Sequence, residues 1–157
     1  MAFDSDDLLR VAGELISAAS PSSSHIARSI STSYYAIFQH LIFETSNLIV
    51  GPHTSGLSRA TDHLQRSLSH GDLQRRCKEL KKRKSDFPVE IVEYAEAVVE
   101  LQEVRHKADY ARNVIFSKRD AEMRLDLARE AISGFDRLEA RHKRAFIIWA
   151  NFDRRAF

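Results

Sequence analysis

The chain has 157 residues, of which 43% are hydrophobic and 29% are charged, and its formal net charge is +2 with the histidines neutral. This length fits one domain with a core of its own, and the single cysteine excludes an internal disulfide bond. No apolar run approaches the roughly 20 residues that cross a bilayer, and the acidic residues 4–7 do not resemble a signal peptide. We therefore expect a cytoplasmic protein without membrane contact, in which any attraction to nucleic acid comes from a local basic patch.

Five glycines and three prolines leave few places to turn, so the sequence predicts long helices. The first helix is capped by Asp4 or Ser5 and runs until Ser20-Pro21, and the second runs from the serines at 22–24 to about Val50. The second helix has two adjacent apolar stripes, which indicates a central place in a bundle or a dimer contact. These stripes consist of Ala27, Ile30, Tyr34, Ile37, Leu41 and Leu48, and of Tyr35, Phe38, Ile42 and Ile49. Tyr34 and Tyr35 are interpreted as core aromatics, and Glu44 as a possible partner of a buried arginine.

The loop around Gly51-Pro52-His53 separates the second helix from a short third helix, predicted from about Leu57 to Leu68, and Gly71 is predicted to break the chain again. Residues 74–84 are the most basic segment. Such a run is typical of a solvated face or a flexible connection. The functional alternative is a patch that follows RNA phosphates, to which Lys81, Lys82 and Arg83 would contribute.

A fourth helix is predicted after a cap at Ser85 or Asp86, and ends near Phe116. Ser117 caps a fifth helix, whose seam runs from Leu125 through Glu139 and His142 to Trp149.

Together these elements predict an all-α protein, an antiparallel bundle of four to five helices that is dimeric through its long helices. The single domain covers residues 1–150, and residues 151–157 form a C-terminal tail.

The fourth helix carries two arginines on its apolar seam, Arg105 and Arg112, where a bundle usually has aliphatic residues. Burying an unpaired guanidinium costs several kcal/mol or more. Arg105 must therefore be paired, lie in a cleft, or lie at an interface. Asp109 follows it at i+4 and is placed to pair with it.

The motif Arg105-x-x-x-Asp109-Tyr110, together with Arg28-Ser-Ile-Ser-Thr-Ser-Tyr-Tyr-Ala-Ile-Phe, resembles the HEPN family of small helical domains over roughly residues 5–140. The resemblance implies a helical module that binds RNA or a nucleotide. Many members of the family are metal-independent endoribonucleases with an Arg-x(4–6)-His signature, and others are non-catalytic partners of nucleotidyltransferases in toxin–antitoxin systems. Tyr110 occupies the place of the signature histidine, so both classes stay open.

In the catalytic interpretation, Arg105 stabilises charge on the scissile phosphate, and Asp109 orients it or helps to transfer protons. Tyr110 has an ordinary pKa of about 10 and is a poor base at neutral pH, so His106 or His53 is the alternative proton carrier. In the structural interpretation, the Arg105–Asp109 pair only fixes the helix register, and Tyr110 packs over it.

The residues expected to contact RNA or a nucleotide share a positive charge or a place in the motif loops. They are Arg28, His53, Lys81, Lys82, Arg83 and Arg112.

Two Glu-x-x-His pairs, Glu103–His106 and Glu139–His142, match the spacing of four-helix di-iron proteins. On the predicted seams Glu139 and His142 point inward, but Glu103 does not, and the seam arginines oppose a dication. The sequence therefore predicts no metal and no cofactor. Arg137 and His142 match the ribonuclease spacing, but their side chains point about 140° apart on a continuous helix.

Cys77 lies among basic residues that favour a low thiol pKa, but no histidine and asparagine pattern supports a catalytic thiol. The sequence thus predicts a HEPN-like RNA- or nucleotide-binding homodimer with a nucleotidyltransferase partner. Two alternatives remain, an endoribonuclease that uses Arg105 and a purely structural dimerisation module.

Overall fold

The computed structural model describes residues 4–51 and 58–152, and within these ranges every regular element is a helix, which confirms the all-α prediction. The helices are α1 (Ser5–Leu15), α2 (Ser23–Ile49), α3 (Ser58–Ser67), α4 (His70–Lys81), the 3₁₀ turn η1 (Lys84–Asp86), α5 (Val89–Tyr110), α6 (Lys118–Asp136) and α7 (Ala140–Asn151). None of the described helices is both long enough and apolar enough to span a bilayer.

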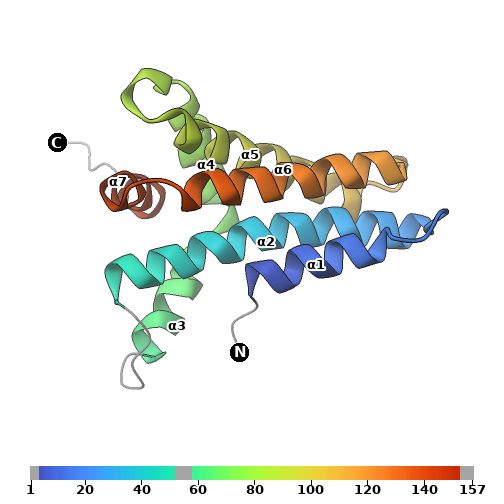
Figure 1. The fold of residues 1–157 in the computed structure, drawn as a ribbon, viewed down its shortest axis with the longest axis horizontal. Coiled ribbons are helices and arrows are strands. Elements are labelled where there is room, and N and C mark those ends of the chain that lie inside the picture. The colour runs from blue at the N-terminus through green and yellow to red at the C-terminus, as the bar shows by residue number, and fades with distance from the viewer. Residues whose placement is uncertain (1–3, 52–57, 153–157) are drawn as a thin grey trace.

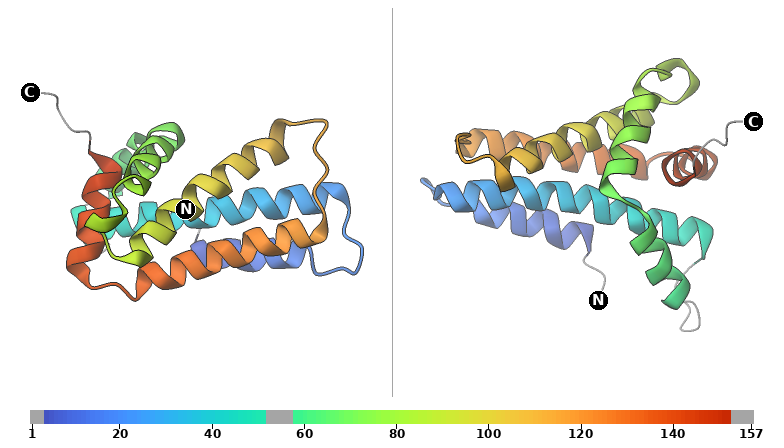
Figure 2. Two further views of the ribbon diagram at one scale, coloured as in Figure 1. Left: turned by 90° about the horizontal axis from the view of Figure 1, so that it is seen from above. Right: turned by 180° about the vertical axis from the view of Figure 1, so that it is seen from behind.

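Four helices, α1, α2, α5 and α6, lie side by side, and each runs antiparallel to the one before it in this set (Figure 1). Helices α4 and α7 gather at the end of the bundle where α6 ends and α5 begins (Figure 2). Helix α2 is central, because it packs against α1, α5 and α6. This position explains why its apolar surface is wider than a single stripe.

Aromatic side chains dominate the main core, where Tyr34, Tyr94, Phe135 and Phe146 are fully buried. A smaller apolar cluster joins α1 to the C-terminal end of α5 and the N-terminal end of α6. Burial of each large apolar side chain stabilises the fold by about 2 kcal/mol. The two clusters hold α2 and α5 together along their whole length, and so fix the side chains that project between them.

Helix α1 ends at Leu15, several residues before the predicted end at Ser20-Pro21. The helix closes there in a tight turn, because the Ser17 hydroxyl, at 2.9 Å, and the Ser17 amide, at 3.2 Å, both donate to the carbonyl oxygen of Glu14. Helix α5 ends at Tyr110, and the chain turns before the predicted end at Phe116.

The predicted fifth helix is two helices, because α6 ends at Asp136 and α7 begins after Glu139. The break lets α7 turn towards α4, where the Trp149 indole nitrogen donates to the carbonyl oxygen of Arg76 at 2.9 Å. Phe146 reaches the main core from this new direction. Tertiary packing has overridden the helical periodicity of the predicted seam.

The basic segment is largely helical, so the interpretation as a flexible connection is wrong for its first part. Helix α4 is capped by Ser69, and Gly71 lies in its first turn without breaking it. Leu73, Cys77 and Leu80 form a fully buried face, and charged residues cover the other side. Burial raises the pKa of the Cys77 thiol to about 12, the opposite of the reactive thiol suggested by its basic neighbours.

Candidate functional site

Three polar side chains join α2 to the last turns of α5. The Ser31 hydroxyl donates to one carboxylate oxygen of Asp109, and the other oxygen lies 3.6 Å from the Arg105 guanidinium. The side chains of Arg105 and Asp109 are only 12% and 19% exposed. The pairing that the i,i+4 spacing predicts is therefore present, and a residue from a second helix anchors it.

Two tyrosines of α2 lie against the Arg105 guanidinium. Its central carbon is 5.1 Å from the ring centroid of Tyr34 and 5.8 Å from that of Tyr35, within the range of cation–π attraction. Tyr34 is a core aromatic, as predicted, whereas Tyr35 is 37% exposed. The arginine is thus held by a carboxylate and by aromatic rings, and one of those rings reaches the surface.

His70, at the start of α4, completes this cluster and was missed by the sequence analysis. Its Nδ1 forms a hydrogen bond with the Tyr34 hydroxyl, and its ring stacks on Phe38 at a centroid distance of 4.1 Å. Burial, and then the charge of Arg105, lower the pKa of His70 below its ordinary value of 6.5, so the imidazole is neutral at pH 7. No local pattern marks this histidine, because Tyr34 is 36 residues away in the sequence.

The cluster keeps unused hydrogen-bonding capacity. Arg105 Nε and Gln102 Oε1 are buried, and neither has a hydrogen-bond partner among the residues that the structure describes. The amide nitrogen of Gln102 donates to the backbone carbonyl of His70 at 3.0 Å. A buried donor without an acceptor costs about 1–3 kcal/mol, so a bound acceptor that reached Arg105 would recover part of this cost.

The other motif residues are all exposed. His106 and Tyr110 are exposed and contact one another, with ring centroids 5.0 Å apart, and Tyr110 is 67% exposed. Arg112 is exposed just after the end of α5. Arg28 is exposed on α2, one turn before Ser31, and so on the same side of that helix. The two arginines therefore flank the contact between Ser31 and Asp109.

The structure separates Lys81, Lys82 and Arg83 from this cluster. Helix α4 begins at His70 and is 12 residues long, which places its far end about 18 Å from the cluster. There the Arg83 guanidinium lies 5.8 Å from the ring centroid of Trp149. His53 lies outside the described residues.

Neither Glu-x-x-His pair faces the interior. Glu103 is exposed and lies 3.2 Å from the Lys78 ammonium group. Glu139, predicted to point inward, is exposed at the start of α7 and lies 2.9 Å from the Arg141 guanidinium. Arg137 and His142 belong to two different segments, because the helix breaks between them.

Comparison with known protein families, with curated proteins and with solved structures found no match to the chain. The resemblance to HEPN domains consequently rests on the two motifs alone. The geometry around Arg105, in which residues of both motifs meet, is the basis on which a function can be argued.

Proposed function

We propose that this protein is a HEPN-like RNA-binding module whose binding site is centred on Arg105. The observation that carries the proposal is the fixed guanidinium, held by Asp109 over the rings of Tyr34 and Tyr35. An arginine whose orientation is set in advance loses little freedom when it binds phosphate. The half-exposed Tyr35 ring supplies a surface on which a base can stack.

RNA is favoured over a mononucleotide by the arrangement of positive charge. Arg28 and Arg112 flank the cluster, and α4 leads from His70 to the basic residues at its far end, about 18 Å away. An extended single strand that follows α4 reaches both groups, whereas a mononucleotide reaches only one. Binding to both groups makes the affinity strongly dependent on salt.

The endoribonuclease alternative is favoured by one specific observation, the neutral imidazole of His70 beside Arg105. A neutral imidazole is a suitable proton acceptor for a ribose hydroxyl. In that mechanism Arg105 stabilises the phosphate charge, and Asp109 positions Arg105. His106 and Tyr110 contact each other on the exposed surface, which favours His70 over both as the proton carrier.

The two apolar stripes of α2 and the seam arginines of α5 suggest a homodimer, and the HEPN resemblance implies a nucleotidyltransferase partner, as in toxin–antitoxin systems. The exposure of Tyr110 supports this part of the proposal, because its hydroxyl is accessible to a modifying enzyme. Ile115, 89% exposed in the α5–α6 connection, adds an apolar group for a protein contact. A monomeric mass in light scattering across micromolar dilution would contradict the homodimer.

The first experiment measures binding of a fluorescent single-stranded RNA at low salt by anisotropy. We expect Arg105→Ala to weaken binding at least tenfold, because the central phosphate contact is lost. Arg124→Ala is the matched control, since Arg124 is also mostly buried, at 19% exposure, and pairs with Glu100 instead. We expect the control to stay within twofold of the wild type.

Charge reversal at Lys82 and Arg83 separates the two ligands. If RNA follows α4, the double variant weakens RNA binding and reduces its salt dependence. If only a nucleotide binds, the variant has the affinity of the wild type. Wild-type protein that binds neither RNA nor nucleotides at low salt would contradict the proposal and favour the structural dimerisation module.

Cleavage is tested with labelled RNA in EDTA. Degradation by the wild type that disappears in both Arg105→Ala and His70→Asn would establish the endoribonuclease. Intact RNA with all three proteins, each folded by circular dichroism, would leave Arg105 as a binding residue.

A further inference from the structure

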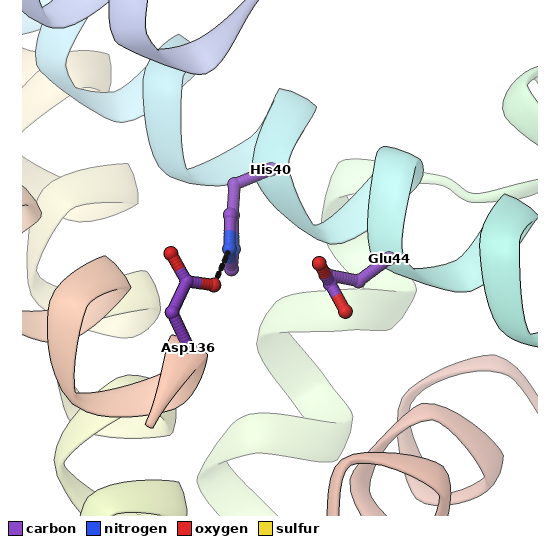
Figure 3. A group of neighbouring side chains, drawn as sticks. All are labelled: His40, Glu44 and Asp136. Carbon is purple, nitrogen blue, oxygen red and sulfur yellow. Dashed lines mark hydrogen bonds and ion pairs between the residues drawn. The ribbon is translucent and has the colours of Figure 1, made fainter. Parts of the chain in front are cut away.

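A second polar cluster lies further along α2 and consists of His40, Glu44 and Asp136 (Figure 3). His40 and Glu44 are four residues apart and share one face of α2, and Asp136 is the last residue of α6. The potential ligand atoms of the three side chains all lie within 4.8 Å of one another. His40 is 5% exposed, whereas the Asp136 side chain is 52% exposed, so the cluster joins the core to the surface.

Hydrogen bonds determine which nitrogen of His40 faces the carboxylates. The Tyr94 hydroxyl donates its one proton to the carbonyl oxygen of Ile37 at 3.1 Å. Its oxygen is also 3.0 Å from His40 Nδ1, and with the Tyr94 proton on the Ile37 carbonyl this oxygen accepts a proton from that nitrogen. A neutral His40 therefore carries its lone pair on Nε2.

This lone pair points at a carboxylate. His40 Nε2 lies 2.8 Å from Asp136 Oδ1, and two acceptors at that distance repel each other unless a positive ion lies between them. A proton on Nε2 satisfies this requirement, and so does a metal ion. A buried relay that fixes the tautomer of a histidine and directs its free nitrogen outward is typical of metal-binding histidines.

The cluster opens into a cavity of about 500 Å³ that is rich in acidic groups. Asp4 and Asp6 line it together with Glu44 and Asp136, and no lysine or arginine is found among the described lining residues. Ser46 also lines the cavity, and its hydroxyl is buried without a hydrogen-bond partner within the described ranges. The surroundings thus concentrate negative charge and leave a polar group for a ligand or its water.

We propose that His40, Glu44 and Asp136 bind a divalent transition-metal ion. One imidazole nitrogen and carboxylate oxygens suit Zn²⁺ or Mn²⁺, and the lack of a thiolate argues against softer ions. A tetrahedral Zn²⁺ holds its ligand atoms about 3.4 Å apart, so the ligand atoms, now within 4.8 Å, need only small side-chain rotations. Three protein ligands leave at least one coordination position open to the cavity.

The test is titration of the full-length protein with Zn²⁺ alone by isothermal calorimetry, with Mg²⁺ for comparison. We expect saturable Zn²⁺ binding that weakens as the pH falls, because protons compete for His40 Nε2. Asp136→Asn and Glu44→Gln should each weaken Zn²⁺ binding at least tenfold. Asp126→Asn, an exposed carboxylate elsewhere on α6, is the matched control and should bind like the wild type.

The variants are chosen so that folding does not obscure the result. His40 is buried, and its removal would disturb the core, whereas Asp136 and Glu44 are at least partly exposed. Two results would overturn the proposal: no saturable Zn²⁺ binding by the wild type, or binding that neither Asp136→Asn nor Glu44→Gln weakens. The titration contains no RNA, so its outcome is independent of the function proposed for Arg105.

Discussion

The Arg105 and His40 clusters both use side chains of the central helix α2, and they differ in the bonding partner that each one lacks. Arg105 has one carboxylate partner, two aromatic neighbours and a buried Nε donor that no described residue accepts. His40 has two carboxylates close to one imidazole nitrogen. The first cluster is short of acceptors, and the second is short of a cation. Their bonding deficits indicate ligands of opposite charge, an anion for Arg105 and a metal ion for His40.

The two clusters are expected to respond unequally when the carboxylate is neutralised. Asp109→Asn should lower the free energy of unfolding by about 2 kcal/mol, because a mostly buried guanidinium loses its counter-charge. Asp136→Asn should change it by less than about 1 kcal/mol, since that side chain is 52% exposed and a neighbouring carboxylate remains. Urea denaturation followed by circular dichroism measures both. Equal losses would show that the Arg105 pair is no more dependent on its carboxylate than the His40 pair.

Removing one hydroxyl tests the relay behind His40. In Tyr94→Phe, His40 Nδ1 loses its acceptor, and the proton can move to Nε2, where it donates to Asp136. We expect Zn²⁺ affinity to fall roughly tenfold or more, with a loss of about 1 kcal/mol in folding stability. Tyr34→Phe is the control, because that tyrosine bonds to His70 and not to His40. An unchanged Zn²⁺ affinity in Tyr94→Phe would remove the tautomer argument.

The sequence predicts those parts of the Arg105 cluster that depend on spacing within one helix. The Arg105–Asp109 pair follows from the i,i+4 interval, and the burial of Tyr34 follows from its place on an apolar stripe. His70 does not follow from any interval, because it reaches Tyr34 only once α4 has folded against α5. For the same reason, Ser31 cannot be recognised in advance as the anchor of Asp109.

The His40 cluster illustrates the same limit. The spacing of His40 and Glu44 is a local signal, but Asp136 is 96 residues away from His40, at the point where α6 ends. The sequence predicts a continuous helix through that point, since no glycine or proline interrupts the segment from 135 to 149. Packing of Trp149 on α4 moves α7 away, and leaves Asp136 at a helix end beside the cavity. A contact that depends on such a break cannot be predicted from the apolar periodicity of the sequence.

Substitutions at Tyr34 and Tyr35 distinguish a tyrosine that stabilises the fold from one that is proposed to contact RNA. Tyr34→Phe should cost about 1 kcal/mol of folding stability, because the bond to His70 is lost in a buried place. Tyr35→Phe should change stability by less than about 0.5 kcal/mol, since its exposed ring keeps its packing. RNA binding should instead be weakened by Tyr35→Ala, in which the stacking surface is removed. Chemical denaturation and anisotropy distinguish these effects, and a larger loss of stability for Tyr35→Phe would contradict the assignment.

The smallest expected effect is the dependence of stability on pH through His70. Burial and the charge of Arg105 lower its pKa in the folded protein below the ordinary 6.5, so the unfolded chain binds this proton at a higher pH. The stability that neutral His70 contributes is therefore fully present above pH 6.5, and is lost as the pH falls through the folded value.

Wild type should accordingly lose more stability than His70→Asn as the pH falls below 6.5. Arg105→Ala should raise the pKa of His70 in an NMR titration, because a neighbouring positive charge is removed, and Arg124→Ala should not. This control holds because the charge of Arg105 acts on His70, whereas Arg124 pairs with Glu100. A His70 pKa that stays the same in Arg105→Ala would show that burial alone lowers it. The imidazole would then be electrically independent of the guanidinium, and the catalytic alternative would lose its argument for pairing the two residues.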